Sequence, residues 1–220
     1  MAPPKKPVRE PGAPAPVQAR TRLARAAVVD AARSLFLDAG YGATTVEAIS
    51  AAAGVPPATV YRLFSSKLGI LKALLDTSIA GDDDEVPVAA RPHVRALLEH
   101  PDPRSQLAGF VQVASDINAR VGLIYRVLVA AASSDRGAAA LFDELSQQRQ
   151  EGQRNIARAL ARRHGLRSGV SERDAADIIH ALLSPELYGL LVFDRGWKVR
   201  RYEQWLTDAL VVQLLEPLAP

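Results

Sequence analysis

The chain has 220 residues, of which 48% are hydrophobic, so it is long enough for one medium domain or two small ones with a buried core. It contains no cysteine, which excludes disulfide bonds and thiolate metal sites. Its apolar runs, such as residues 182–192, are too short and too interrupted to span a bilayer. We therefore expect a soluble cytoplasmic protein with no membrane partner.

The net charge of +3 is unevenly distributed along the chain. Residues 1–80 hold ten Lys and Arg against five Asp and Glu, whereas residues 81–220 hold seventeen against nineteen. A basic module beside a mildly acidic one favours a polyanionic partner for the first. A basic tail with no partner would give the same balance, so charge alone leaves both interpretations open.

The pattern along the chain predicts a tail followed only by helices. Residues 1–18 are rich in Pro and Ala and have almost nothing to bury, which predicts disorder. No later stretch alternates as a strand would, so the fold class is all-α, with about nine to ten helices. The helices are expected at 20–39, 44–54, 57–64, 68–79, 89–100, 103–120, 121–134, 136–164, 171–195 and 198–215, with a linker at 81–87.

Local signals set the ends of the first helices. Gly40 stands where the first helix should end in the left-handed region. Thr44 and Glu47 have the spacing of a capping box for the second helix, which Gly54 ends. Pro57 suits the first turn of the third helix, because its missing N–H is no loss there.

The second and third helices and the turn between them predict a helix-turn-helix, whose second member enters the major groove of DNA. Val60 and Phe64 share a face that must pack on the two preceding helices. The other faces of residues 57–64 then point outward and carry polar side chains. For Tyr61 the alternative is a half-buried core aromatic.

Reach and chemistry divide the outward residues into two roles. Phosphate contacts are expected from hydroxyl and ammonium groups and from helix-end amides, and the side chains concerned are Thr45, Thr59, Tyr61 and Lys67. Base edges would be met by side chains near the start of the third helix and on its exposed face, namely Pro57, Ala58, Thr59, and Arg62 or Leu63.

The sequence offers little for an enzyme. The histidines are scattered without metal-ligand spacing: His93, His100, His164 and His180. No metalloprotease, serine hydrolase or phosphate-loop motif is present. Asp174 and Asp177 precede His180 on one predicted helix and could orient its imidazole, but an ordinary polar stripe has the same spacing. We predict no catalytic residue, no metal and no cofactor.

The segment TRLARAAVVDAARSLFLDAGYGATTVEAISAAAGVPPATVYRLFSSKLGILKALL resembles the DNA-binding domain of the TetR (tetracycline repressor) family of transcriptional regulators. The matching pieces are AA..LF...GY in the first helix, TTVEAI in the second, AGV at the turn and T-V-Y-R-x-F-x-S-K through the third. Two positions depart from the family pattern: Ser50 stands where Ala is usual, and Pro56 stands where Ser or a similar N-cap is common.

The resemblance implies a helix-turn-helix domain at 19–66 and a helical domain at 67–220 that binds a small effector and dimerises. Weak candidates for effector contacts are polar residues on otherwise apolar stretches, namely Asn118, Tyr125, His180 and Tyr188. The last two helices would form the dimer interface, with candidate residues Gly189, Val199, Tyr202, Leu206 and Ala209. A single-chain core would produce the same apolar stripes.

The sequence thus predicts a transcriptional regulator, most simply a repressor, that binds a palindromic double-stranded DNA operator as a homodimer and is released by a small-molecule effector. Two alternatives remain: a helical protein that binds small molecules without a DNA role, and a helical enzyme.

Overall fold

The computed structural model describes residues 16–81 and 86–217, and every element in these ranges is helical, with no strand. The all-α prediction is therefore confirmed. The elements are α1 (Pro16–Ala43), α2 (Val46–Ala53), α3 (Pro57–Phe64), α4 (Lys67–Ala80), η1 (Val88–Ala90), α5 (Pro92–Leu97), α6 (Pro103–Ala132), α7 (Arg136–His164), α8 (Glu172–Leu182), α9 (Pro185–Tyr188), the π-helical η2 (Gly189–Asp194) and α10 (Val199–Leu214).

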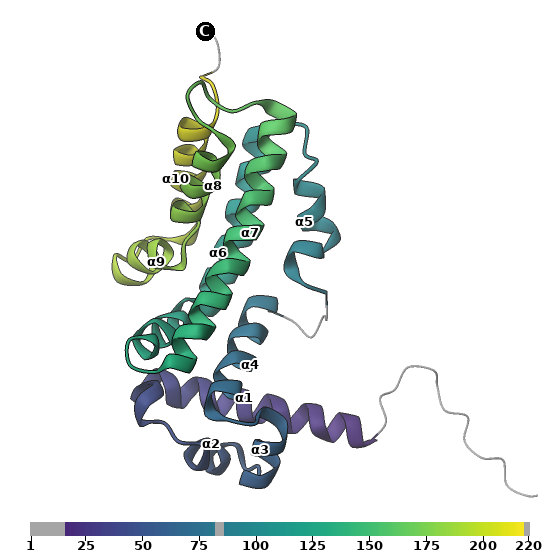
Figure 1. Ribbon diagram of the computed structural model, residues 1–220, viewed down its shortest axis with the longest axis vertical. Coiled ribbons are helices and arrows are strands. Elements are labelled where there is room, and N and C mark those ends of the chain that lie inside the picture. The colour runs from purple at the N-terminus through teal and green to yellow at the C-terminus, as the bar shows by residue number, and fades with distance from the viewer. Residues whose placement is uncertain (1–15, 82–85, 218–220) are drawn as a thin grey trace, which may run out of the picture.

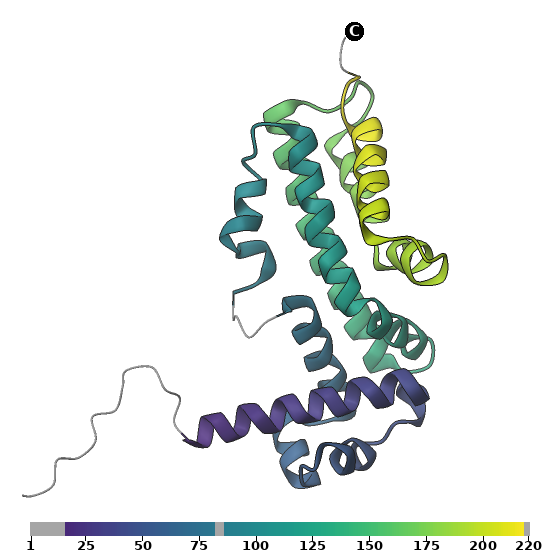
Figure 2. The ribbon, with the colours of Figure 1, turned by 180° about the vertical axis from the view of Figure 1, so that it is seen from behind.

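The molecule consists of a small N-terminal helical unit and a longer body (Figure 1). Helix α1 runs across one end of the body, with α2 and α3 on its outer side, and α4 rises from this unit into the body. Helices α6 and α7 run side by side along the body, with α5 on one side and α8 and α10 on the other (Figures 1 and 2).

Helix α1 is longer than predicted. It begins at Pro16, so residues 16–18, assigned to the tail, are helical, while residues 1–15 lie outside the described residues. Proline suits this first helical turn because its fixed φ is helical and it has no N–H to satisfy. Gly40 takes a positive φ of 79° that interrupts the helix, and one further turn follows it.

The predicted capping box of α2 is wrong by one residue. Thr45 is the N-cap, and its hydroxyl oxygen accepts from the Ala48 amide at 3.1 Å. Thr44 is buried instead, and its hydroxyl donates to the Gly40 carbonyl at 2.8 Å. Both threonines can satisfy a helix-end group, so the sequence pattern could not choose between them.

Two predicted boundaries in the body also change. The segments 103–120 and 121–134 form one helix, α6, because nothing between them breaks the backbone. Segment 171–195 is divided into α8, α9 and η2. Ser184 caps α9 by accepting from the Leu187 amide at 3.1 Å, and Pro185 occupies its first turn. Pro185 therefore starts a new helix inside the segment that was predicted to be one helix.

The core has two clusters of buried side chains. The first joins α1, α2 and α3 to α4 and to the adjoining parts of α6 and α7, and includes Phe36, Phe64 and Leu71. The second joins α6 and α7 to α8 and α10. A domain boundary between residues 66 and 67 therefore runs through the first cluster, because α4 shares that core with the N-terminal helices.

One stretch, Glu172–Asp194, has the length and apolar composition of a membrane-spanning helix, and less than half of it is buried within the protomer. In the structure it is broken into α8, α9 and η2, and α8 packs against α7 and α10. Part of its apolar surface is therefore buried in the second core of the helical body.

Candidate functional site

The α2–α3 unit is held by its turn. Gly54 adopts the left-handed conformation (φ 63°, ψ 25°) and donates its N–H back to the end of α2. The buried hydroxyl of Ser50 donates to the Val55 carbonyl and fixes the residue after the glycine. The serine that departs from the family pattern thus makes a hydrogen bond that alanine could not make.

Helix α3 has one buried face and one open face. Val60 is 1% exposed and Phe64 is 6% exposed, which anchors the helix on the first core. Pro57, Ala58 and Arg62 are exposed, as predicted for residues that meet DNA. The structure places the remaining two candidates differently: Thr59 and Leu63 are half-buried, and Leu63 packs against the core.

Tyr61 lies on the open face of α3 with 45% of its surface exposed, which excludes the core-aromatic alternative. Its hydroxyl donates to Glu47 Oε1 at 3.2 Å, and this hydrogen bond raises the pKa of the phenol. The ring is thereby held between α3 and α2.

Arg25 on α1 supports the end of α3 and was missed by sequence reasoning. Its Nη1 donates to the Leu63 carbonyl at 3.1 Å, and its guanidinium lies 4.7 Å from the centre of the Phe64 ring. A cation belongs at the last carbonyls of a helix. The contact spans 38 positions, so no local pattern could have revealed it.

Lys67, predicted to contact phosphate, has partners within the protein. Its ammonium donates to the carbonyls of Tyr41 at 2.7 Å and Thr44 at 2.9 Å, and it lies 4.3 Å from the centre of the Tyr41 ring. It therefore ties the start of α4 to the connection between α1 and α2. A phosphate contact at Lys67 stays a prediction and would share the ammonium with these carbonyls.

The two prolines at the start of α3 have a common explanation. Pro56 is the N-cap with φ −55° and ψ 140°, the extended region imposed on any residue before proline. Its carbonyl accepts from the amides of Thr59 and Val60, so the first helical turn closes without a side-chain cap. Pre-set backbone angles thus compensate for the missing N-cap side chain.

A second site lies in the body, where α4, η1, α5, α6, α7 and the start of α9 surround a cavity of about 340 Å³. Most of its lining is apolar, including Phe110, Ile117 and Ile156. Asn118 and Tyr125, two of the effector candidates, also line it. The cavity is at the lower end of the range for small-molecule sites, about 300 to 1,000 Å³.

Polar contacts concentrate where α6, α7 and α8 meet. Arg149 lines the cavity, and its Nη2 lies 3.0 Å from His180 Nε2. His180 Nδ1 lies 2.5 Å from Oε1 of Gln153, which also lines the cavity. His180 thus contacts two residues that line the cavity, although it does not line the cavity itself. Sequence reasoning missed Arg149, because exposed arginines surround it on α7 and no spacing marks it.

The other polar candidates have separate roles. Asn118 is buried and donates to the Leu183 carbonyl at 3.4 Å. The Tyr125 hydroxyl donates to Glu186 at 2.7 Å, and burial raises the pKa of this phenol. Tyr188 lies outside the cavity lining in the core, edge-on to Tyr202 with ring centres 5.1 Å apart. Its predicted effector contact is corrected accordingly, because an aromatic residue at that position fills the core.

The dimer candidates divide into inward and outward residues. Tyr202 and Leu206 are buried in the second core and cannot form an outer face, which corrects their assignment. Gly189 accommodates Arg126 of the same chain, since a Cβ there would lie 2.7 Å from the arginine Nη2. Val199 is 39% exposed and Ala209 is partly exposed.

The outward apolar face is therefore rotated from the predicted one. On α10 it is formed by Trp205 and Val212, which lie two turns apart on the same side of the helix. Leu190 of η2 and Val199 at the start of α10 are also more than a third exposed. Periodicity predicted a stripe but could not tell which side of it faced the core.

In the described ranges no group of three or more His, Asp or Glu side chains is placed to hold a metal ion. A helix-turn-helix with an open second helix, joined to a helical body with an apolar cavity, is the architecture expected of a DNA-binding transcriptional regulator.

Residues 28–74 match the family of bacterial regulatory proteins described as the tetR family, so the N-terminal domain belongs to that family. No curated protein sequence matches the chain significantly.

Solved structures extend the likeness to the whole fold. NalD, the secondary repressor of the MexAB-OprM multidrug efflux pump in Pseudomonas aeruginosa, is 22% identical over 90% of this chain and 98% of its own, with a TM-score of 0.67. A regulator from Saccharomonospora viridis in complex with choline is 19% identical over 88% and 98%, with a TM-score of 0.65. The fatty acid degradation regulator FadR from Bacillus halodurans is 17% identical over 84% and 93%, with a TM-score of 0.63.

Proposed function

We propose that the protein is a cytoplasmic repressor that binds a palindromic operator as a homodimer and releases it when a small molecule enters the cavity. The observation that carries this function is the open face of α3. Pro57, Ala58, Tyr61 and Arg62 are exposed on a helix that Val60 and Phe64 anchor from beneath. A rigid helix with an outward polar face meets the requirement for reading a major groove.

Roles on this face follow from position. Arg62 is the candidate for a bidentate contact with guanine, whereas Tyr61 and Thr45 would position the helix on phosphates. The Thr45 oxygen accepts from the Ala48 amide, which leaves its hydroxyl proton for an external acceptor. Pro57 and Ala58 would make apolar contact with thymine methyl groups.

Dimerisation is supported by the outward apolar face of α10 and η2. Trp205 and Val212 are 38% and 60% exposed, and tryptophan is enriched at protein interfaces. The incomplete burial of Glu172–Asp194 within one protomer is consistent with a second copy packed there. A dimer would present two α3 helices to half-sites about 34 to 36 Å apart.

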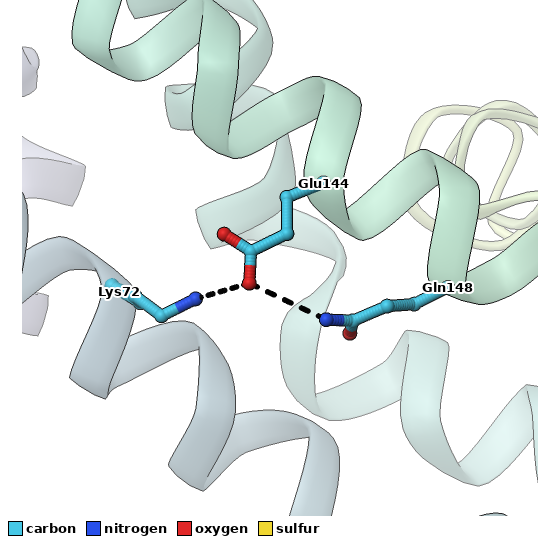
Figure 3. A network of polar contacts seen from close by, with 3 residues as sticks. All are labelled: Lys72, Glu144 and Gln148. Atoms are coloured by element: carbon cyan, nitrogen blue, oxygen red, sulfur yellow. Dashed lines mark hydrogen bonds and ion pairs between the residues drawn. The ribbon is translucent and has the colours of Figure 1, made fainter.

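Coupling between the cavity and the DNA-binding unit has a physical route. Arg120 lies on α6 between the cavity-lining residues Asn118 and Tyr125 and donates to the Ser78 and Ile79 carbonyls at the end of α4. Figure 3 shows a second link, in which Lys72 of α4 and Gln148 of α7 both contact Glu144. Gln148 also lines the cavity. Coupling energies of about 1 to 3 kcal/mol are typical.

The related structures support repression and a small-molecule response but give no common effector. NalD is described as a repressor of an efflux pump, the Saccharomonospora viridis regulator holds choline, and FadR is described as a fatty acid degradation regulator. At 17% to 22% identity these chemistries do not transfer to this chain.

Selection of bound duplexes from a random DNA pool at low salt tests the function. We expect enrichment of one palindrome. Arg62→Ala should relax specificity at one base position per half-site at a cost of about 1 to 3 kcal/mol. Arg154→Ala, an exposed position on α7, serves as the control and should bind like the wild type.

Recovery of no palindrome would reject the repressor. If Arg62→Ala also left every measured property unchanged, the alternative of a small-molecule-binding protein without a DNA role would be favoured.

A further inference from the structure

The cavity lining contains one charged side chain among the residues that the structure describes, and it is Arg149. The rest of the lining is apolar or carries neutral polar groups such as Asn118, Ser146 and Gln153. A lone cation at the wall of an apolar site favours an anionic ligand, because charges interact more strongly where water is displaced.

Arg149 is oriented by a chain of hydrogen bonds through His180 to Gln153. A guanidinium has only donors, so His180 Nε2 must accept from Arg149 Nη2, and His180 Nδ1 must then donate to Gln153 Oε1. Burial and the nearby Arg149 lower the pKa of His180, which keeps the imidazole in the neutral form that this arrangement needs. The chain from Gln153 through His180 therefore orients the guanidinium without neutralising its charge.

The guanidinium has hydrogen-bonding capacity to spare. Its Nη1 is shielded from solvent and has no hydrogen-bond partner, and Arg149 forms no ion pair with a carboxylate in the described part of the chain. A buried charged donor without an acceptor is costly. An incoming carboxylate, with two acceptor oxygens, would remove this cost by a small rotation of the guanidinium.

The two carboxylates near His180, Glu186 and Asp177, do not take the place of a ligand carboxylate beside Arg149. Glu186 already accepts from Tyr125 and lies outside the lining. Asp177 is exposed on α8, likewise outside the lining. Both raise the pKa of His180 and so act on its charge from outside the cavity.

The cavity also indicates the size of the ligand. Its volume of about 340 Å³ lies at the lower end of the range for small-molecule sites, about 300 to 1,000 Å³. The apolar side chains of Phe110, Val113, Ile117 and Leu145 line the same space. A ligand of about a dozen non-hydrogen atoms with one polar end matches this size and chemistry.

We propose that the effector is a monoanionic carboxylate with an apolar body, whose carboxylate is bound by Arg149 while the body lies among the apolar residues of α5, α6 and α7. This inference rests on the proposed function only in calling the ligand an effector. The ligand class follows from the cavity itself.

The test compares three probes of equal chain length by titration calorimetry with the full-length protein at neutral pH: decanoate, decan-1-ol and decyltrimethylammonium. We expect decanoate to bind about 10- to 100-fold more tightly than decan-1-ol, the range for a hydrogen bond to a charged group. Decyltrimethylammonium should bind most weakly, because Arg149 repels it. Equal affinities for the three probes, or a preference for the cation, would overturn the proposal.

Two variants and one control locate the effect. Arg149→Gln should reduce decanoate affinity to that of decan-1-ol and leave decan-1-ol affinity unchanged. Arg149→Lys should keep part of the preference for decanoate, because lysine retains the positive charge but lacks the paired N–H donors of the guanidinium. Arg154→Gln, exposed on the same helix, should bind all three probes like the wild type. Undiminished decanoate binding by a folded Arg149→Gln protein would overturn the assignment of Arg149.

Gel shifts on the selected operator separate this proposal from the repressor function. We expect decanoate to release wild-type protein from DNA and to leave Arg149→Gln bound. Carboxylate-selective binding without any operator would reject the repressor and keep the ligand class. Operator binding with no carboxylate preference would reject the ligand class and keep the repressor.

Discussion

The two ends of this molecule distribute polar and apolar groups in opposite ways. In the α1–α3 unit, apolar Val60 and Phe64 are buried and polar Tyr61 and Arg62 face outward. In the body, Arg149 lies at the wall of the apolar cavity, and apolar Trp205 and Val212 face outward. An outward polar face suits a charged partner such as DNA, whereas a polar group at the wall of an apolar cavity suits a small ligand, and an outward apolar face suits another protein surface.

This difference also explains which function could be recognised. The DNA-binding unit is formed by residues close in sequence, so its chemistry is visible as a motif. The cavity draws its lining from α4 to α9, and its chemistry becomes visible only when those helices are packed together.

The largest expected effect tests the anchor beneath the open face of α3. Phe64→Ala removes a side chain that is 6% exposed and should lower the free energy of unfolding by about 3 to 5 kcal/mol. Chemical denaturation measures the loss. Leu23→Ala, at a side chain 69% exposed on α1, should change it by less than about 0.5 kcal/mol and serves as the control. Equal effects of the two substitutions would mean that α3 is not anchored through Phe64.

The outward apolar face of the body gives the next effect. Val212→Glu should weaken dimerisation by at least about 10-fold, because it places a charge in an apolar interface at a cost above roughly 1.4 kcal/mol. Sedimentation or light scattering over a dilution series measures the dissociation constant.

Tyr202→Ala provides the inward comparison on the same helix. It should lower stability, since Tyr202 is 1% exposed within its own protomer. If Val212→Glu left the dimer intact while Tyr202→Ala dissociated it without loss of stability, the face assignment would have to be reversed.

Lys67 gives a smaller effect that distinguishes a structural role from a DNA contact. Lys67→Met removes hydrogen bonds to the Tyr41 and Thr44 carbonyls and should cost about 1 to 3 kcal/mol of stability without DNA. Lys72→Met breaks the half-exposed pair with Glu144 and should cost less than about 1 kcal/mol, which makes it the matched control.

A Lys67→Met protein with wild-type stability would assign Lys67 to phosphate alone. In that case operator affinity should fall about equally for all sequences, and the slope of its salt dependence should decrease by about one unit for each phosphate interaction removed.

The sequence by itself determined the helical class, the helix-turn-helix and the anchors Val60 and Phe64. Helical periodicity, glycine turns and proline positions are local properties, so they can be read without the fold. The same reasoning placed Tyr61 and Arg62 on the outward face of α3, where the structure has them.

Only the tertiary structure decided which candidates share a site. A one-residue choice of N-cap moved the start of α2 from Thr44 to Thr45, and packing turned Tyr202 and Leu206 inward while leaving Trp205 and Val212 outside. The contact between Arg149 and His180 joins two helices across 31 positions. Side-chain direction and long-range contact depend on how helices pack, and a local pattern carries neither.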